Sequence, residues 1–173
     1  DHVSRDDATV VAVDVADKRL LGALEEEFGD IVDFNIDHHI SNVRFAKNLF
    51  LDADAAATAE SMYELLGIMK VNINDVTAKA LYTGIATDTG CFKYSNVTAK
   101  THMIVAQLYE YNIDAPEINR IMFDTKSRKL LELERMVLDA SEFHFGGKCI
   151  ILPVTAEMQE KTGCSGTELE GIA

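Results

Sequence analysis

The stretch Ile31-Val-Asp-Phe-Asn-Ile-Asp-His-His39 carries most of the information about the fold of this 173-residue chain. It opens with a short, largely apolar run that is typical of a strand in a parallel sheet. The run ends on an aspartate and two histidines, so chemically active side chains directly follow a strand. The same pattern occurs earlier, where Ala8-Thr-Val-Val-Ala-Val13 ends on Asp14. Both segments favour an α/β sheet, in which ligands bind outside the carboxyl ends of the strands.

The segment between these two strands has the apolar spacing of a helix over residues 17–28, with Gly29 at its end. A third strand is expected over residues 45–51. We therefore predict an α/β fold, with a doubly wound, mostly parallel sheet and flanking helices.

Further helices are predicted over residues 54–66 and 75–86. Asp54 is the expected N-cap of the first helix, and Asn74 or Asp75 of the second. The second helix leads into a polar stretch that contains Asp88.

Composition changes after the connector segment, from Phe143 onward. An amphipathic connector helix is predicted within residues 125–140. Beyond it, residues 143–152 read as a β-hairpin around two glycines, and residues 155–162 as a short helix. We therefore divide the chain into residues 1–124, the connector, and the start of a smaller α/β domain over residues 141–173.

The chain contains 29 acidic and 16 basic residues, which gives a formal net charge of −13. This balance argues against a duplex-DNA binder that neutralises phosphates over a basic face. No apolar run is long enough to cross a bilayer, and there is no basic-then-apolar leader. The three cysteines form no CxxC pair, which favours reduced structural thiols. We expect a cytoplasmic protein without a membrane partner.

The residues best suited to bind a metal ion or to take part in catalysis are Asp14, the run Asp37-His38-His39, and Asp88. Carboxylate oxygen and imidazole nitrogen together suit Mn²⁺ or Mg²⁺ ahead of a structural zinc ion. An aspartate beside the histidines can also fix the orientation of an imidazole ring. The alternative for a single strand-end aspartate is a helix cap or a solvated turn.

Three segments in this order resemble motifs of the DHH phosphoesterase superfamily. They are Val13-Asp-Val-Ala-Asp17, Asn35-Ile-Asp-His-His-Ile-Ser-Asn42 and Gly84-Ile-Ala-Thr-Asp-Thr-Gly-Cys-Phe92. The helix between the second and third motifs also looks like its counterpart in the family. The chain is most similar to short members that degrade very short RNA oligonucleotides and dephosphorylate 3′-phosphoadenosine 5′-phosphate (pAp). RecJ-type exonucleases, cyclic-dinucleotide phosphodiesterases, exopolyphosphatases and manganese pyrophosphatases share these motifs and stay open as alternatives.

The resemblance implies a site with two divalent ions, Mn²⁺ or Mg²⁺, that activate water for hydrolysis. It implies that Asp14 bridges the two ions and that His38 and Asp88 bind the second one. Asp37 is expected to support the histidine ligand, and His39 to face the scissile phosphate, so these two are the predicted catalytic residues.

The loop residues Thr87, Thr89 and Gly90 are plausible substrate-binding donors, although a turn at a helix end explains them equally well. Two family features are absent. No His-x-x-x-Asp-x-Asp motif precedes Asp14, and His2 has the wrong spacing to replace it. The glycine-rich carboxyl-terminal motif is missing as well. Residues 1–124 thus resemble a DHH domain that lacks its first motif, and residues 141–173 resemble the beginning of the associated substrate domain.

We accordingly predict a metal-dependent phosphoesterase that acts on short single-stranded oligoribonucleotides or pAp. The full-length protein is expected to bind two ions. This chain is expected to be a fragment that binds at most one ion weakly and has little activity. Hydrolysis of pyrophosphate, polyphosphate or a cyclic dinucleotide is the alternative among enzymes, and a non-catalytic nucleotide-binding module is the alternative from another class. A homodimer stays open.

Overall fold

The computed structural model describes residues 8–166, 169 and 172. The chain forms two compact units, Asp1–Phe123 and Asp124–Ala173. In the part of the chain that the structure describes, no helix combines the length and apolarity that a bilayer span requires.

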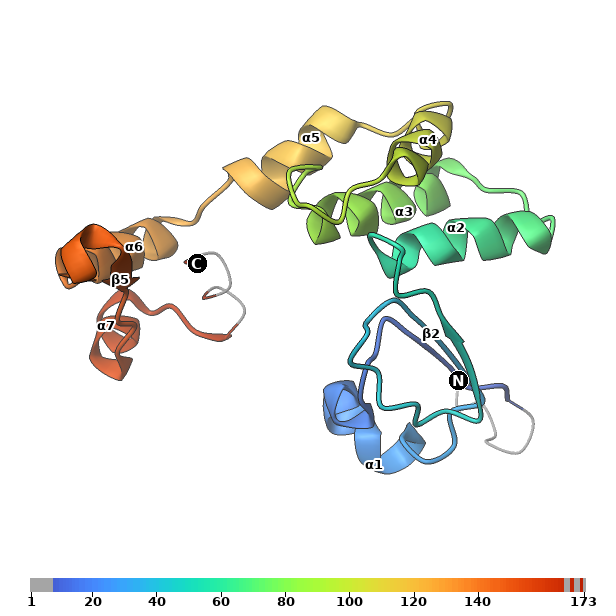
Figure 1. Ribbon diagram of the computed structural model, residues 1–173, viewed down its shortest axis with the longest axis horizontal. Helices are drawn as coiled ribbons and strands as arrows, with labels where there is room; N and C mark the ends of the chain where they lie inside the picture. Colours follow the sequence, from blue (N-terminus) through green and yellow to red (C-terminus); the bar gives the residue numbers. More distant parts are fainter. Residues whose placement is uncertain (1–7, 167–168, 170–171, 173) are drawn as a thin grey trace. The chain divides into compact units, whose positions relative to one another are not determined.

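The first unit contains a three-stranded parallel sheet (Figure 1). Its strands are β1 (Val11–Val13), β2 (Phe34–Asp37) and β3 (Asn48–Leu51), in the order β1-β2-β3. Each strand is shorter than its apolar run in the sequence. The predicted α/β class with a parallel sheet is confirmed. Because the strands are parallel, their carboxyl ends, and the polar residues that follow them, lie at one edge of the sheet.

The connection between β1 and β2 differs from the predicted helix over residues 17–28. It consists of a 3₁₀ segment, η2 (Lys18–Leu24), and a single α-helical turn, α1 (Glu25–Phe28). Gly22 has φ of 58° and ψ of −124°, and this left-handed conformation interrupts the helix. The leucine spacing was misleading because Leu20 and Leu24 remain exposed instead of packing into a core.

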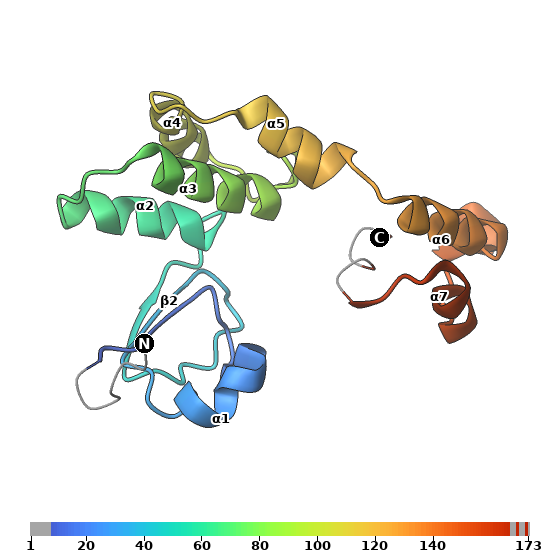
Figure 2. The same cartoon turned by 180° about the vertical axis from the view of Figure 1, so that it is seen from behind.

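Four helices form the rest of the first unit, and Figure 2 shows them from behind. They are α2 (Thr58–Ile68), α3 (Asp75–Asp88), α4 (Ala99–Leu108) and α5 (Ala115–Asn119), and a π-helical turn over Arg120–Asp124 follows α5. Their buried side chains include Tyr82, Ile85 and Leu108. A Cβ atom added at Gly84 would lie only 3.0 Å from the Cβ of Ala59, so glycine permits the close approach of α3 to α2.

The helix starts were predicted with mixed success. Asn74 caps α3 as expected, because its side chain accepts a hydrogen bond from the backbone of Thr77. Asp54 does not cap α2. That helix begins three residues later, after Ala57, which is extended and buried. Ala55, Ala56 and Ala57, the three alanines before the helix, are buried. This burial comes from tertiary packing, which the capping preference of Asp54 does not take into account.

The second unit contains α6 (Arg128–Asp139), an antiparallel hairpin, and α7 (Ala156–Thr162). The hairpin strands are β4 (Glu142–His144) and β5 (Cys149–Ile151), joined by a 3₁₀ turn over Phe145–Gly147. The predicted amphipathic helix, hairpin and short helix are therefore confirmed. Their core contains Leu133, Val137 and Cys164, with partly buried Met158, Leu169 and Ile172 packed against it. The roles assigned to residues 1–124, 125–140 and 141–173 stay predictions.

Candidate functional site

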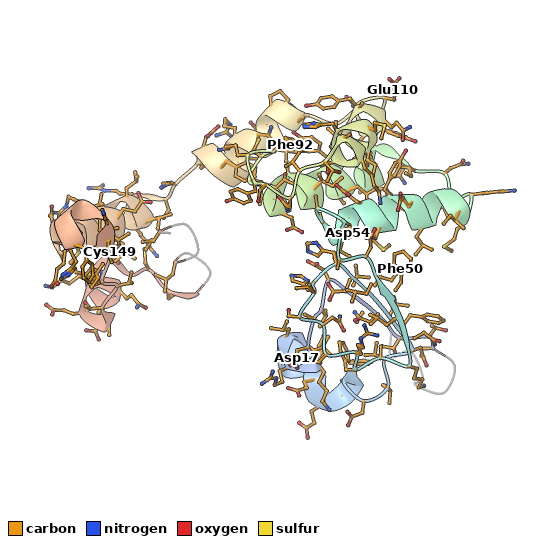
Figure 3. The ribbon with its side chains drawn as sticks, in the orientation of Figure 1. Asp17, Phe50, Asp54, Phe92, Glu110 and Cys149 are labelled. Atoms are coloured by element: carbon orange, nitrogen blue, oxygen red, sulfur yellow. The ribbon has the colours of Figure 1, made fainter. Side chains whose placement is uncertain are left out.

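Residues from distant parts of the first unit converge at the carboxyl edge of the sheet. Asp14 follows β1, His38 follows β2, and Asp88 is the last residue of α3. The Nε2 atom of His38 lies 3.5 Å from Oδ2 of Asp88 and 3.9 Å from Oδ1 of Asp14. Figure 3 labels Asp54 where the chain passes from β3 to α2, at this same edge. The structure thus brings together the three residues that the sequence analysis placed as ligands.

Asp14 occupies a turn whose geometry is fixed from two sides. Its φ of 62° lies in the left-handed region, which is uncommon for a residue other than glycine. Its backbone N–H donates to the carbonyl oxygen of Ile36, with a distance of 2.9 Å. The hydroxyl of Thr58, the first residue of α2, donates to Oδ1 of the carboxylate at 2.7 Å. Sheet and helix together therefore hold this carboxylate at the edge.

The imidazole of His38 has a defined tautomer. Its Nδ1 atom lies 3.1 Å from the carbonyl oxygen of Ala55, which can only accept a hydrogen bond. Nδ1 therefore carries a proton, and Nε2 is the ring nitrogen that faces the carboxylates of Asp14 and Asp88. Neutral imidazole with a free nitrogen is the form that binds a metal ion.

Asp37 lies beneath the site and its side chain is completely buried. It accepts hydrogen bonds from the backbone N–H groups of His38 and His39, from Nδ1 of His39 at 2.7 Å, and from the amide of Asn42 at 2.6 Å. Burial by itself raises the pKa of this carboxyl, but the hydrogen bonds outweigh burial, and the pKa lies below its ordinary value. The expectation that Asp37 supports the ring of the ligand histidine needs adjustment, because the ring it contacts is that of His39.

His39 is about half exposed. Its hydrogen bond to Asp37 raises the pKa of the imidazole, although burial acts in the opposite direction. One ring nitrogen of His38, one of His39 and a carboxylate oxygen of Asp14 lie within 4.8 Å of one another. Since Nδ1 of His39 donates to Asp37, it has no lone pair for a cation, and the outer Nε2 is the atom left for a ligand. His38 has the same pattern, with Nδ1 donating and Nε2 free, so the phosphate-facing role of His39 stays a prediction.

Asp88 is partly buried, and this raises the pKa of its carboxyl, with a further increase from the nearby carboxylate of Asp14. A divalent cation between the carboxylates would offset their repulsion. Ligands at about 2.1 Å from an octahedral ion are about 3.0 Å apart at right angles and about 4.2 Å apart across it. The separations of 3.5 and 3.9 Å around His38 fall within this range. Asp14 and Asp88 each approach Nε2 of His38 closely enough to share a cation with it. The three residues whose ligand atoms all lie within 4.8 Å of one another are Asp14, His38 and His39, so a cation held by both carboxylates stays a prediction.

The three predicted substrate-binding residues lie in different surroundings. Thr87 lines a cavity together with Asp14 and Asp88, and its hydroxyl donates to carbonyl oxygens of its own helix. Thr89 is fully buried, and its hydroxyl donates to the carbonyl of Ile85 at 2.6 Å. Gly90 has φ of 53° in the turn after α3. The side chain of Thr89 is thus committed to ending the helix, and the substrate roles of all three residues stay predictions.

The cavity has a volume of about 330 Å³ and is largely apolar. Its polar end carries Asp14 and Asp88. The rest is formed by residues of α2 and α3 that include Met62, Leu66 and Leu81.

Two groups of supporting residues were missed by the sequence analysis. Thr58 was not singled out, although its hydroxyl donates to Asp14. Asn35 and Asn42 were quoted only as the ends of a motif, although their buried side chains lie beside Asp37. The sequence contained one signal for this network, because Asn35 falls within the short, largely apolar segment that was predicted to be a strand. A buried amide requires polar partners, so an asparagine in such a strand indicates a polar contact nearby.

Comparison with curated proteins finds relatives with a common description. The bifunctional oligoribonuclease and PAP phosphatase NrnA of Thermus thermophilus is 36% identical over 158 residues, which cover 90% of this chain and 46% of the relative. The probable bifunctional oligoribonuclease and PAP phosphatase NrnA of Streptococcus mutans is 28% identical over 165 residues, which cover 95% and 52%. The chain spans about half the length of these relatives.

Comparison with solved structures finds the same fold in an exopolyphosphatase-related protein from Bacteroides fragilis. The TM-score is 0.84, with 24% sequence identity, and the match covers 97% of this chain and 51% of the other. No family model matches the chain.

Proposed function

Because the chain belongs to the DHH phosphoesterase superfamily, in the branch of the bifunctional oligoribonuclease and PAP phosphatase relatives, we propose that the whole protein is a metal-dependent phosphoesterase. Its proposed substrates are short single-stranded oligoribonucleotides and pAp. The single observation that carries the proposal is the convergence of Asp14, His38 and Asp88 at one edge of the sheet, with His39 beside them.

The residues of this chain divide into two proposed roles. Asp14, His38 and Asp88 hold a divalent cation, Mn²⁺ or Mg²⁺, through oxygen and nitrogen atoms. When bound, such a cation neutralises charge on a phosphate and lowers the pKa of water. His39 is held by Asp37 through Nδ1, so its Nε2 can face the phosphate and donate or accept a proton there.

Charge supports a role for a cation in substrate binding. The chain has a formal net charge of −13, and carboxylates flank the site. A phosphate ester would be repelled by these groups, whereas a bound cation reverses the local charge. We therefore expect substrate binding to require the divalent ion.

Hydrolysis by the full-length protein tests the proposal. Release of phosphate or nucleotide would be measured with Mn²⁺ or with a chelator, on pAp, a ribodinucleotide, a cyclic dinucleotide and polyphosphate. We expect turnover of the first two substrates with Mn²⁺ only, and at least a hundredfold loss in Asp88→Ala. Asp30→Ala, which removes a carboxylate with 87% of its side chain exposed, is the matched control and should retain activity.

Other outcomes would distinguish the alternatives. Preference for polyphosphate over pAp would favour the inorganic-substrate enzymes of the superfamily. Binding of pAp without turnover under any metal condition would contradict the enzymatic proposal and favour a nucleotide-binding module.

A further inference from the structure

Two buried asparagine side chains lie between the turn that carries Asp14 and the turn that carries the histidines. Asn35 is in the middle of β2 and is fully buried, and Asn42 follows the histidine turn and is 9% exposed. The Nδ2 atom of Asn42 lies 2.7 Å from Oδ1 of Asn35 and 2.6 Å from Oδ2 of Asp37. The two amides and the carboxylate form one hydrogen-bonded chain.

The orientation of both amides follows from the chemistry of their neighbours. The backbone N–H of Arg44 donates to Oδ1 of Asn42 at 2.7 Å, so the other end of this amide, Nδ2, faces Asn35 and Asp37. The Nδ2 atom of Asn35 lies 3.3 Å from the carbonyl oxygens of both Ala12 and Val15, which can only accept. Neither amide could be reversed without placing oxygen against oxygen.

The hydrogen atoms of the two amides are therefore fully used. Asn42 donates to Asn35 and Asp37 at short distances and also lies 3.3 Å from the carbonyl of Val15, and Asn35 donates to the backbone of Ala12 and Val15. These two backbone carbonyls lie on either side of Asp14 in the sequence. The chain of bonds thus runs from the backbone around Asp14, through two amides, to the carboxylate that holds His39.

We propose that Asn35 and Asn42 are positioning residues that fix the turn of Asp14 relative to the turn of His38 and His39. The proposal rests on the proposed function of this site. Neither asparagine is placed to touch a cation or substrate, so both would act through Asp37 and through the backbone beside Asp14. A buried network in which each donor and acceptor is satisfied holds its members in one arrangement, and removal of one member releases the others.

Asn42→Ala removes the side-chain link between the two turns and leaves the backbone hydrogen bonds from Val43 to Ala16 and from Asp14 to Ile36 in place. In this chain we expect Mn²⁺ binding, measured by paramagnetic broadening of histidine side-chain NMR signals, to weaken by about tenfold. Asn48→Ala is the matched control, because this exposed asparagine at the start of β3 donates only to the backbone of Asp33. It should leave Mn²⁺ binding unchanged.

A second measurement needs no metal. In the wild-type chain, the ¹⁵N shifts of His39 should show a proton fixed on Nδ1, as its bond to Asp37 requires. In Asn42→Ala the loosened Asp37 should allow a mixture of the two tautomers. Asn42→Ser keeps one donor and should lie between wild type and alanine, which provides a test if the alanine variant fails to fold.

A double-mutant comparison of Asn42→Ala with Asp37→Ala distinguishes a positioning role of Asn42 from a general effect on folding. If Asn42 acts through Asp37, Asn42→Ala should weaken Mn²⁺ binding far less in an Asp37→Ala background than in the wild type. Equal losses in both backgrounds would overturn the proposal, as would wild-type tautomer and Mn²⁺ affinity in a folded Asn42→Ala or Asn42→Ser chain. Absence of Mn²⁺ broadening in the wild type would contradict the proposed function instead, and the tautomer measurement would still decide the role of Asn42.

Discussion

The hydroxyl of Thr58 donates a 2.7 Å hydrogen bond to Oδ1 of Asp14, although 44 positions separate the two residues in the sequence. One residue begins α2 and the other follows β1, so this contact joins the helical part of the first unit to the edge of its sheet. A carboxylate with one oxygen held in this way loses less rotational freedom when it binds a cation.

Thr58→Val removes this hydroxyl with almost no change in shape. We expect Mn²⁺ affinity to fall by about fivefold, equivalent to about 1 kcal/mol, the typical net contribution of one hydrogen bond. Calorimetric titration measures the change. Thr83→Val is the control, because that hydroxyl donates to the carbonyl of Lys79 within its own helix, and equal losses in both variants would contradict the role of Thr58.

The number of cations bound is a second prediction. Among the described residues, the group of His, Cys, Asp and Glu side chains whose ligand atoms lie close enough to hold a metal ion is Asp14, His38 and His39, and Asp88 lies 3.5 Å from His38 beside it. We expect this chain to bind at most one Mn²⁺ ion in calorimetry, and His38→Ala to abolish binding. His144→Ala, on the exposed strand β4, should leave binding intact. Two tight sites would refute the prediction.

Gly90 offers a prediction about stability. It has φ of 53°, and a Cβ atom there would lie 2.3 Å from the ring of Tyr94. Gly22 has φ of 58° and ψ of −124°, with no atom within 4 Å of such a Cβ, so Gly22→Ala measures the cost of a glycine backbone conformation without any clash.

Gly90→Ala should therefore lower the free energy of unfolding by more than Gly22→Ala does. Urea denaturation measures both changes. Addition of Tyr94→Ala should remove the excess, since the ring is the obstacle. An equal cost for the two glycines would show that the ring of Tyr94 moves aside freely.

Tyr82 provides a prediction about pH. Burial raises the pKa of its phenol to about 12, and its hydroxyl donates to Oδ1 of Asn119. As the pH rises above about 10, the unfolded chain loses this proton and the folded chain keeps it. The free energy of unfolding should then decrease by up to about 1.4 kcal/mol per pH unit until about pH 12.

Absorbance at the tyrosinate band during alkaline titration tests this prediction. Tyr82 should ionise last, and Tyr82→Phe should remove that final step. Tyr94→Phe, which alters an exposed ring, should leave the final step in place. Loss of the final ionisation step in Tyr94→Phe would contradict its assignment to Tyr82.

The sequence predicted those parts of the fold that depend on short, strongly patterned segments. The strand ends that carry Asp14 and Asp37 were located, as was the helix capped by Asn74. The failures have physical causes that local pattern does not contain. A left-handed Gly22 interrupts the first connection, and buried alanines displace the start of α2 from Asp54.

The site shows the same division. Asp14, His38 and Asp88 could be proposed as a group because their residue types and motif order resemble a family. The contacts of Thr58 and Asn42 could not, since each depends on how a side chain crosses between elements. Thr89 is a different case. The sequence left two interpretations open, a substrate donor and a turn at a helix end; its hydroxyl donates to the carbonyl of Ile85 at the end of α3, and its substrate role stays a prediction.

The division into two units has a consequence for spectroscopy. All five tyrosines lie within Asp1–Phe123, and the chain has no tryptophan. Intrinsic fluorescence of the whole chain therefore reports on the unit that carries the site, while circular dichroism in the far ultraviolet senses the helices of both. Comparison of the two signals during unfolding separates the stability of one unit from that of the other without any added label.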